Sequence, residues 1–234
     1  MFKRVLFLAM LLFLGCGTTV WAREFSLEER EALEALVVPS PVIALFEGED
    51  VEILQDVSEE WYYVRHCVTD QKHWARAQHL IIPSDPPTLD IPMAKQQLED
   101  YVNMMEFASA TKYFVWTDIS RQKTYVFMGS KGNWALNRVI VCSTGKNHSP
   151  TKRGMFTLQE RGDWFYSERL KSGAKFWVRF HGTYLYHSHC MDRNQVLMEQ
   201  VVGIRQSSGC VRMSVEDARW FYNTVAEGSA VFIY

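Results

Sequence analysis

The feature that most constrains this fold is a group of three prolines within five residues, Pro83-Ser84-Asp85-Pro86-Pro87. Proline fixes its own φ angle, lacks a backbone donor and restricts the residue before it, so no helix or central strand runs through such a segment. A chain of 234 residues is long enough for one large domain or two modest ones. We therefore predict a small unit over residues 23–88 and a larger one over residues 89–234.

The small unit is predicted to be a short helix followed by a β-module. Ser26 and Glu29 form a capping-box pattern, and apolar residues then follow at helical spacing: Leu33, Leu36 and Val37. Between Gly48 and Ile82 the sequence changes to short alternating segments separated by polar turns, as is typical of small β-modules. The predicted strands cover residues 50–57, 60–68 and 74–77.

The three predicted strands carry a pattern that resembles a bacterial SH3-like domain. The segments are Val51-Glu52-Ile53-Leu54, Trp61-Tyr62-Tyr63-Val64 and Trp74-Ala75-Arg76. His73 stands where that family usually has glycine before the tryptophan. The resemblance implies a small SH3-like β-barrel.

The larger unit is predicted to be mostly β. A first helix after Pro92 has an apolar stripe of Leu98, Tyr101, Val102 and Met105. A last helix is capped by Ser214 and Asp217. Strands are expected between them and at the end of the chain, over residues 113–117, 124–128, 135–142, 154–158, 176–180, 183–187 and 230–234. The expected fold class is mainly β with a few helices.

Charge is nearly balanced over the whole chain but not along it. With 25 basic and 27 acidic residues the formal net charge is −2, which argues against a nucleic-acid partner. Residues 23–60 carry 2 basic and 12 acidic side chains, whereas residues 121–179 carry 12 basic and 3 acidic ones. We expect the two units to attract each other, so that the small module forms one wall of a cleft in the larger unit. A cationic face there would also attract a substrate rich in carboxylates.

The first 22 residues have the pattern of a secretory signal peptide. Lys3 and Arg4 precede an apolar run over residues 5–14, which is too short to span a bilayer as a helix. Val20-Trp21-Ala22 has the small-residue pattern of a signal-peptidase site, and Phe13-Leu14-Gly15-Cys16 is an imperfect lipoprotein box. The sequence thus predicts an exported, periplasmic or cell-wall-associated protein of the cell envelope, with lipidation at Cys16 or an uncleaved anchor as alternatives to cleavage.

One loop has the composition of a thiol active site. Ser207-Ser208-Gly209-Cys210-Val211-Arg212 leads into the Ser214-capped helix, and a cysteine beside glycine can expose its sulfur next to outward-pointing backbone N–H groups. A thiol nucleophile needs a base, and His187 lies 23 residues upstream at the end of an aromatic strand. That separation alone does not establish a pair. The other cysteines beyond the leader are Cys67, Cys142 and Cys190; they are expected to be buried thiols, with one disulfide among them as the alternative that export permits.

Residues 111–234 resemble the L,D-transpeptidase catalytic domain, also called YkuD. Five segments match that family in order: Cys142-Ser143-Thr144-Gly145, Thr151-x-x-Gly154-x-Phe156, Phe176-Trp177-Val178-Arg179-Phe180, His187-Ser188 and Ser207 to Met213. The resemblance implies a YkuD-type β-sandwich with Cys210 as nucleophile and His187 as base. It implies no cofactor and no metal.

The same resemblance implies roles for the neighbours of these two residues. The Ser188 carbonyl would orient the imidazole, and the N–H groups of Gly209 and Cys210 would form an oxyanion hole. Arg212 would meet a substrate carboxylate or brace the loop, and Ser207 and Ser208 would contact substrate.

The sequence departs from the family pattern at two positions and leaves two alternatives open. Ser208 replaces the histidine that usually precedes the Gly-Cys pair, and Lys152 replaces a proline. His189 is a rival base because it would share a strand face with His187. The second alternative is a zinc site, because the segment from His187 to Cys190, together with Cys210, contains side chains of the types that bind zinc.

The implied function is cross-linking of peptidoglycan stem peptides by acyl transfer. Cys210 would attack the carbonyl after the L-centre of the third stem residue and expel D-Ala, and an amine on an acceptor stem would resolve the thioester. The sequence leaves open an envelope protein as acceptor and the oligomeric state. Water as acceptor would make the protein an L,D-carboxypeptidase. A noncatalytic wall-binding protein, with Ser208 marking a decayed site, is the alternative from another class.

Overall fold

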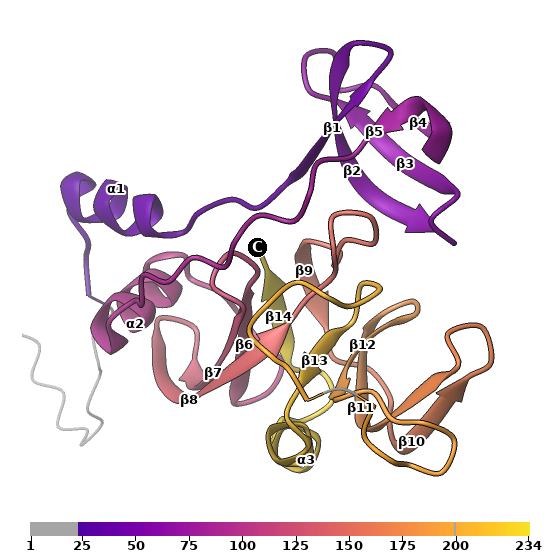
Figure 1. Cartoon of the computed structure of the whole chain (residues 1–234). Helices are drawn as coiled ribbons and strands as arrows, with labels where there is room; N and C mark the ends of the chain where they lie inside the picture. Colours follow the sequence, from indigo (N-terminus) through magenta and orange to yellow (C-terminus); the bar gives the residue numbers. More distant parts are fainter. Residues whose placement is uncertain (1–22, 199) are drawn as a thin grey trace, which may run out of the picture.

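The computed structural model describes residues 23–198 and 200–234. The predicted leader and the alternative lipidation site at Cys16 therefore lie outside the described residues. The fold is mainly β with three α-helices in the described ranges, as the sequence predicts, and it comprises a small five-stranded sheet and a larger body (Figure 1). Within those ranges no helix has the length and apolar character to cross a membrane.

The small sheet is an antiparallel meander closed at one edge by its last strand. Its strands are β1 (Val42–Phe46), β2 (Glu49–Val57), β3 (Trp61–His66), β4 (Lys72–Arg76) and β5 (Leu80–Ile81). They lie in the order β4-β3-β2-β1-β5 and enclose a core of their own. The three predicted strands are present. The sequence does not predict β1, because β1 precedes Gly48, where the alternating pattern begins. It does not predict β5 either, because β5 has only two residues.

Helix α1 (Leu27–Leu36) has the predicted capping box but packs elsewhere than predicted. Glu29 N–H donates to Ser26 Oγ at 3.2 Å, and Ser26 N–H donates to Glu29 Oε2 at 2.9 Å. Leu33 and Val37 pack in one cluster with helix α2 (Lys95–Met104) of the larger body. The predicted unit over residues 23–88 is thus split in the structure: its sheet stands apart, while its helix covers the larger body beside α2 (Figure 1).

Helix α2 begins three residues after Pro92, and the Ala94 N–H at its start donates to Gln97 Oε1 at 2.8 Å. Leu98, Tyr101 and Val102 of the predicted stripe are buried, whereas the last predicted member, Met105, is 41% exposed because the helix ends before it.

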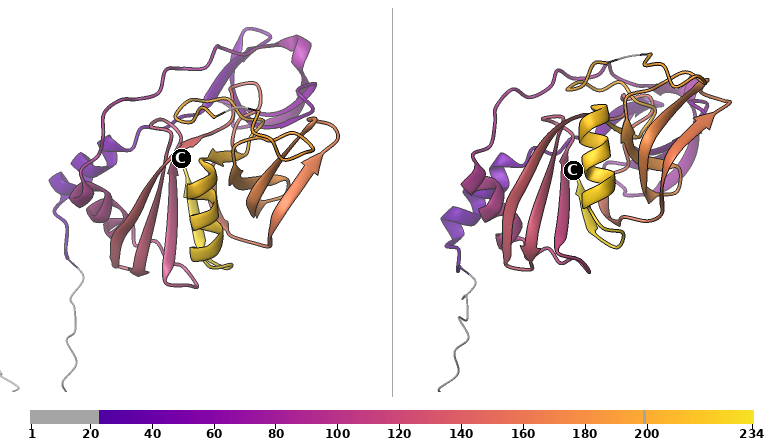
Figure 2. Two further views of the ribbon diagram at one scale, coloured as in Figure 1. Left: turned by 60° about the horizontal axis from the view of Figure 1, so that its bottom comes forward. Right: turned by 90° about the horizontal axis from the view of Figure 1, so that it is seen from below.

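Nine strands build the larger body, in the order β10-β11-β12-β13-β8-β7-β6-β14-β9. Their bounds are β6 (Tyr113–Asp118), β7 (Lys123–Ser130), β8 (Asn133–Ser143), β9 (Gly154–Thr157), β10 (Arg161–Ser167), β11 (Ser172–His181), β12 (Tyr184–Ser188), β13 (Val211–Met213) and β14 (Ala230–Ile233). β8 joins the two halves, because it pairs with β7 along its length and with β13 at Cys142 and Ser143. Helix α3 (Val215–Thr224) lies between the halves, with β6–β8 on one side and β10–β12 on the other (Figure 2).

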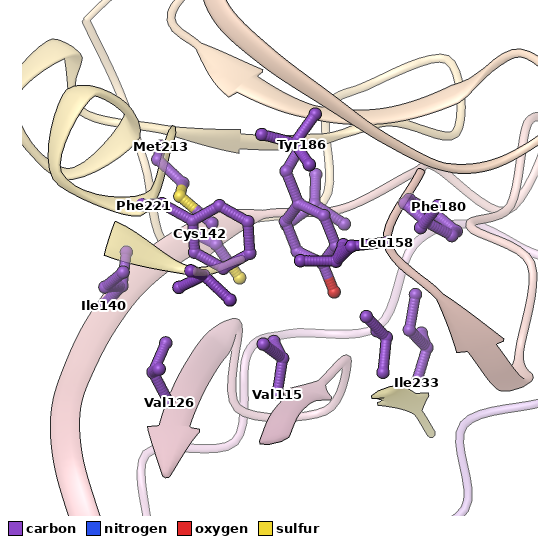
Figure 3. Packing of buried hydrophobic residues seen from close by; sticks show 14 of the residues in the cluster. Val115, Val126, Ile140, Cys142, Leu158, Phe180, Tyr186, Met213, Phe221 and Ile233 are labelled. Carbon is purple, nitrogen blue, oxygen red and sulfur yellow. The ribbon is translucent and has the colours of Figure 1, made fainter. Parts of the chain in front are cut away.

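The main core fills the space between these halves. Val115, Val126 and Ile140 face it from β6, β7 and β8, and Tyr186 and Met213 face it from β12 and β13 (Figure 3). The Tyr186 hydroxyl is hydrogen-bonded to Thr117 Oγ1 at 2.8 Å, so this buried polar group is satisfied. Because side chains alternate along a strand, the residues next to Tyr186 and Met213 must face away from the core.

Two strands of this body were not predicted. β10 contains the consecutive aromatics Trp164, Phe165 and Tyr166, which hide the alternation of a half-buried strand, and β13 has only three residues. The other seven predicted segments each contain a strand.

Candidate active site

Cys210 and His187 come from two parallel strands that lie side by side. β12 pairs with β13 in the register Tyr186 to Val211 and His187 to Arg212. Tyr186 and Val211 are core residues, so their neighbours along each strand face the opposite side of the sheet. Cys210 directly precedes Val211 and therefore shares that outer face with His187.

Both side chains line one cavity of about 370 Å³ on the outer face. His187 and Leu185 come from β12, and Cys210 and Arg212 come from the end of the loop and β13. Cys190 and Ser208 come from the segment between β12 and β13. The rest of the lining comes from β10, β11 and the turns beside them: Phe165, Ser167, Arg169, Leu170, Ser172, Gly173, Trp177, Arg179 and Thr183. The predicted site residues His187, Ser208, Cys210 and Arg212 are thus brought to one place.

His187 is held in a single tautomer. Its ring is 4% exposed, and Nδ1 lies 2.6 Å from the Ser188 carbonyl oxygen. A carbonyl only accepts hydrogen bonds, so Nδ1 carries the proton and the lone pair is on Nε2. Burial is the main cause that lowers the pKa of His187 to about 4; the Ser188 hydrogen bond acts in the opposite direction, and the charge of Arg212 acts in the same direction as burial. At neutral pH the imidazole is neutral and Nε2 can accept a proton.

The Cys210 thiol is also neutral at rest. Burial raises its pKa to about 11, while a main-chain hydrogen bond from Leu185 and the charge of Arg212 act in the opposite direction. Its Sγ lies 3.8 Å from the Thr183 carbonyl oxygen, which can accept the thiol proton. The two groups are therefore a thiol and a neutral imidazole rather than an ion pair.

The loop before Cys210 depends on glycine at position 209. Gly209 has a φ of +101°, and a Cβ at this position would lie 2.6 Å from Cε1 of Tyr184. A larger residue would therefore meet both backbone strain and the Tyr184 ring. In the structure the Gly209 N–H donates to Ser207 Oγ at 3.1 Å, so this N–H is already engaged inside the loop.

Ser207 lies in a different place from its predicted neighbour Ser208. It is 1% exposed, and its hydroxyl donates to the Cys210 carbonyl oxygen at 2.5 Å. Ser208 is exposed and lines the cavity. The geometry makes Ser207 a brace within the loop, and of the two serines only Ser208 is placed to meet a substrate.

Several cavity residues were not predicted as site residues. Trp177 and Arg179 alternate with Val178 and Phe180, which are core residues, so they point to the cavity side of β11. That alternation is visible in the sequence and could have identified them. Phe165 lies edge-on to the His187 ring, with ring centroids 5.5 Å apart, but it belongs to the strand that sequence reasoning missed.

The rival base and the other cysteines occupy different surroundings. His189 is 7% exposed and does not belong to the cavity lining in the described part of the chain. Cys142 is buried and Cys190 lines the cavity beside Cys210, but Cys67 is exposed, so its predicted burial is wrong. Cys67 follows the end of β3 in a turn, where its side chain has no core to enter. Over residues 23–198 and 200–234 there is no group of three or more His, Cys, Asp and Glu side chains arranged to hold a metal ion.

The small sheet does not form a wall of this cavity, contrary to the expectation from charge. Every residue lining it lies between positions 165 and 212, as far as the described residues show. The module instead contacts the chain around residues 147–153, where Glu52 forms an ion pair with Arg153. Attraction between the acidic and basic segments is thus visible in one pair, but it acts away from the cavity.

The larger body is similar to known proteins. The L,D-transpeptidase catalytic domain, YkuD, matches residues 112–233. A protein of Bacillus subtilis (strain 168) named "Putative L,D-transpeptidase YciB" is 30% identical over 135 residues, which are 55% of this chain and 70% of that protein.

The chain also resembles solved structures to different degrees. A fused Zn-dependent amidase/peptidase/peptidoglycan-binding domain-containing protein from Clostridium acetobutylicum ATCC 824 is 31% identical with a TM-score of 0.52. The match covers 60% of this chain and 59% of that one, so the chain spans less than two thirds of that protein. An L,D-transpeptidase from Mycobacterium tuberculosis H37Rv is more distant, with 21% identity, a TM-score of 0.44 and coverage of 53% and 57%.

The larger body is thus a mainly β fold that places a cysteine and a histidine side chain in one cavity. Because the family match covers more than half of the chain, this protein belongs to the L,D-transpeptidase (YkuD) family.

Proposed function

We propose that the protein is an exported L,D-transpeptidase that cross-links peptidoglycan stem peptides through a thioester on Cys210. The observation that carries this proposal is the placement of Cys210 and His187 in one cavity, with His187 Nδ1 bonded to the Ser188 carbonyl and Nε2 left as acceptor. A thiol beside an oriented neutral imidazole is the arrangement that thiol acyl transfer requires.

In the first half-reaction His187 Nε2 takes the proton of the Cys210 thiol while Sγ attacks the donor carbonyl after the third stem residue. The C–S bond forms and the carbonyl becomes a tetrahedral oxyanion. His187 then returns the proton to the nitrogen of D-Ala, the C–N bond breaks and D-Ala leaves. In the second half-reaction an acceptor amine attacks the thioester, loses a proton to His187 and regenerates the thiol.

The neutral resting state has a consequence for this mechanism. Because burial favours the uncharged form of both groups, charge separates only when substrate is attacked. Proton transfer to His187 therefore accompanies C–S bond formation instead of preceding it.

The oxyanion is proposed to accept hydrogen bonds from the main-chain N–H groups of Gly209 and Cys210. The Gly209 N–H donates to Ser207 Oγ at 3.1 Å, so it would have to give up this hydrogen bond and turn toward the substrate. Arg212, which sits beside His187 in register, is proposed to meet a substrate carboxylate, and Ser208 at the rim to contact the stem. Phe165 and Trp177 supply the apolar walls.

The small sheet is proposed to be an SH3-like barrel that handles the wall polymer. Five antiparallel strands with the last strand closing onto the first support this assignment. Trp61 and Trp74 are 39% and 48% exposed on its surface, which suits contact with a glycan or peptide. The export signal and a periplasmic or wall location rest on the sequence pattern of residues 1–22, with Cys16 as the alternative lipid anchor.

The test is a reaction of the purified protein with disaccharide-tetrapeptide muropeptides, followed by mass spectrometry. Transpeptidation predicts a dimer whose mass is that of two muropeptides less one alanine. Release of tripeptide without dimer would identify an L,D-carboxypeptidase instead. Unchanged muropeptides together with binding to sacculi would contradict the enzymatic proposal and favour the wall-binding alternative.

A further inference from the structure

A loop of the larger body, residues 146–153, is the surface on which the small sheet rests; we name it the support loop. The Tyr62 hydroxyl donates to the His148 carbonyl oxygen at 2.9 Å, although the Tyr62 ring is fully buried in the core of the module. The Ser149 hydroxyl donates to Asp56 Oδ2 at 3.1 Å. Two neighbouring positions of the support loop are thus fixed by β2 and β3.

Charged and polar contacts fix both ends of the same loop. At one end Glu52, which is 3% exposed, forms an ion pair with Arg153. At the other end the Asn147 N–H donates to Asp85 Oδ1 at 2.5 Å, and Asn147 Nδ2 donates to the Ser84 carbonyl at 2.9 Å. The proline linker and the module therefore hold the support loop from outside along nearly its whole length.

From its other side the support loop contacts the nucleophile loop. Gly145 forms a parallel bridge with Ser207, and the Lys146 N–H donates to the Ser207 carbonyl at 3.1 Å. Between the module contacts, Thr151 is 4% exposed and its hydroxyl donates to the Gly209 carbonyl oxygen at 2.9 Å. Thr151 Oγ1 itself accepts a hydrogen bond from the Gly145 N–H at 2.8 Å, so Thr151 ties both segments together.

We propose that the small module is a positioning element for the nucleophile, acting through the support loop and Thr151 on Gly209. Gly209 has a positive φ and lies against Tyr184, and within its own loop its N–H is held by Ser207 Oγ. The Thr151 bond fixes the plane that carries the Gly209 carbonyl and the Cys210 N–H. A shift of the support loop would therefore turn that N–H and move Sγ relative to His187.

This inference rests on the proposed function and gives the module a second role besides wall contact. The module would supply three positioning residues, Tyr62, Asp56 and Glu52, since none of them lines the cavity with Cys210. Misplacement of reacting groups by about 1 Å can cost on the order of 10²-fold in rate, so a modest contact far from sulfur can matter.

The first experiment uses Thr151→Val and Thr151→Ser in the full chain. Valine keeps the shape and removes the hydroxyl, whereas serine keeps the hydroxyl. Labelling of Cys210 by a carbapenem is followed by mass spectrometry to give the maximal acylation rate and the concentration at half-maximal rate. We expect the maximal rate to fall by on the order of 10²-fold in Thr151→Val and by less than about threefold in Thr151→Ser, with the half-saturating concentration unchanged.

The second experiment keeps the catalytic body untouched. Tyr62→Phe removes one hydroxyl from the module, and Tyr63→Phe is the matched control, because the Tyr63 hydroxyl has no hydrogen bond to any residue that the structure describes. We expect about three- to tenfold slower acylation in Tyr62→Phe and the wild-type rate in Tyr63→Phe. All molecules should still become labelled, since a merely unfolded fraction would lower the final extent of labelling and not the rate.

The outcomes separate this inference from the function on which it rests. Wild-type protein that takes no label contradicts the proposed function. A labelled wild type with equal rates in Thr151→Val and Tyr62→Phe overturns the positioning role. A reduced extent of labelling at the wild-type rate also overturns it, because that result describes stability alone.

Discussion

At the scale of single residues, burial decides the protonation states of the proposed catalytic pair. His187 is buried and lies against Phe165. Among the described residues no Asp or Glu side chain lines the cavity, so nothing there offsets the effect of burial, and the charged form of His187 is disfavoured. Cys210 is half-buried in the cavity lining, and desolvation disfavours its thiolate as well. In the proposed mechanism the pair therefore starts with no charge on either group.

This predicts an unusual dependence of acylation on pH. An ordinary histidine base would lose activity below about pH 6.5. Because the pKa of His187 is lowered to about 4, its neutral form persists through pH 5, and we expect the carbapenem acylation rate to change less than about threefold between pH 5.5 and 8. Thermal unfolding at each pH controls for stability. An acidic limb centred near pH 6.5 would contradict the assignment.

The choice between two histidines is also a residue-scale prediction. General-base assistance is worth about 10²- to 10⁴-fold, so His187→Ala should lose a factor of that order in acylation rate. His189→Ala should lose little, since His189 lies outside the described cavity lining. Acylation kinetics and melting temperatures of both variants decide the matter. The opposite order of effects would mean that the base has been misassigned by two positions.

At the scale of elements, the pairing of β12 with β13 brings the site together. The sequence predicts β12 by its aromatic alternation, and the loop around Cys210 by its family pattern. It does not predict β13, since three residues carry no periodic signal, nor the register that sets His187 beside Arg212. β10 was missed for another reason, consecutive aromatics, and with it Phe165 was missed. Non-local pairing of this kind is decided by packing, which short patterns do not encode.

The nucleophile loop gives a prediction at this scale. Gly209→Ala places a Cβ 2.6 Å from the Tyr184 ring at a φ of +101°. We expect this variant to remain folded, because the close contact involves a single ring of the main core, that of Tyr184, and to lose at least about 10²-fold in acylation rate. Gly203→Ala is a useful comparison, since Gly203 also has a positive φ but a Cβ there would meet only Val141 at 3.4 Å. Equal rates in the two variants would contradict the role of the loop.

At the scale of the whole molecule, the proline cluster separates the small sheet from the larger body, but the helix before that sheet returns to α2. The sequence predicts that this helix belongs to the module only because the helix directly precedes the module along the chain. The capping box and apolar spacing of α1 were readable, whereas its partner was not. The charge asymmetry likewise predicted attraction between the units but not where they meet.

Glu52 takes part in the contact between the units, and its replacement should change the stability of the protein. This carboxylate is 3% exposed and pairs with Arg65 and Arg153. Glu52→Gln removes the charge and leaves two arginines without it, so we expect the free energy of unfolding to fall by about 1–3 kcal/mol in urea titrations. Glu60→Gln, an exposed change on the same module, should stay within about 0.5 kcal/mol of wild type. Equal stabilities would show that the pair contributes nothing.

The central claim is that Cys210 is the acyl-accepting nucleophile. The most direct measurement is peptide mapping by mass spectrometry after reaction with a carbapenem, for wild type, Cys210→Ala and Cys190→Ala. Cys190 is the sharpest control because it is a second thiol in the same cavity. We predict one intact drug added to the peptide carrying Cys210 in wild type and Cys190→Ala, and no adduct in Cys210→Ala. An adduct that survives in Cys210→Ala, or one that requires Cys190, would contradict the claim.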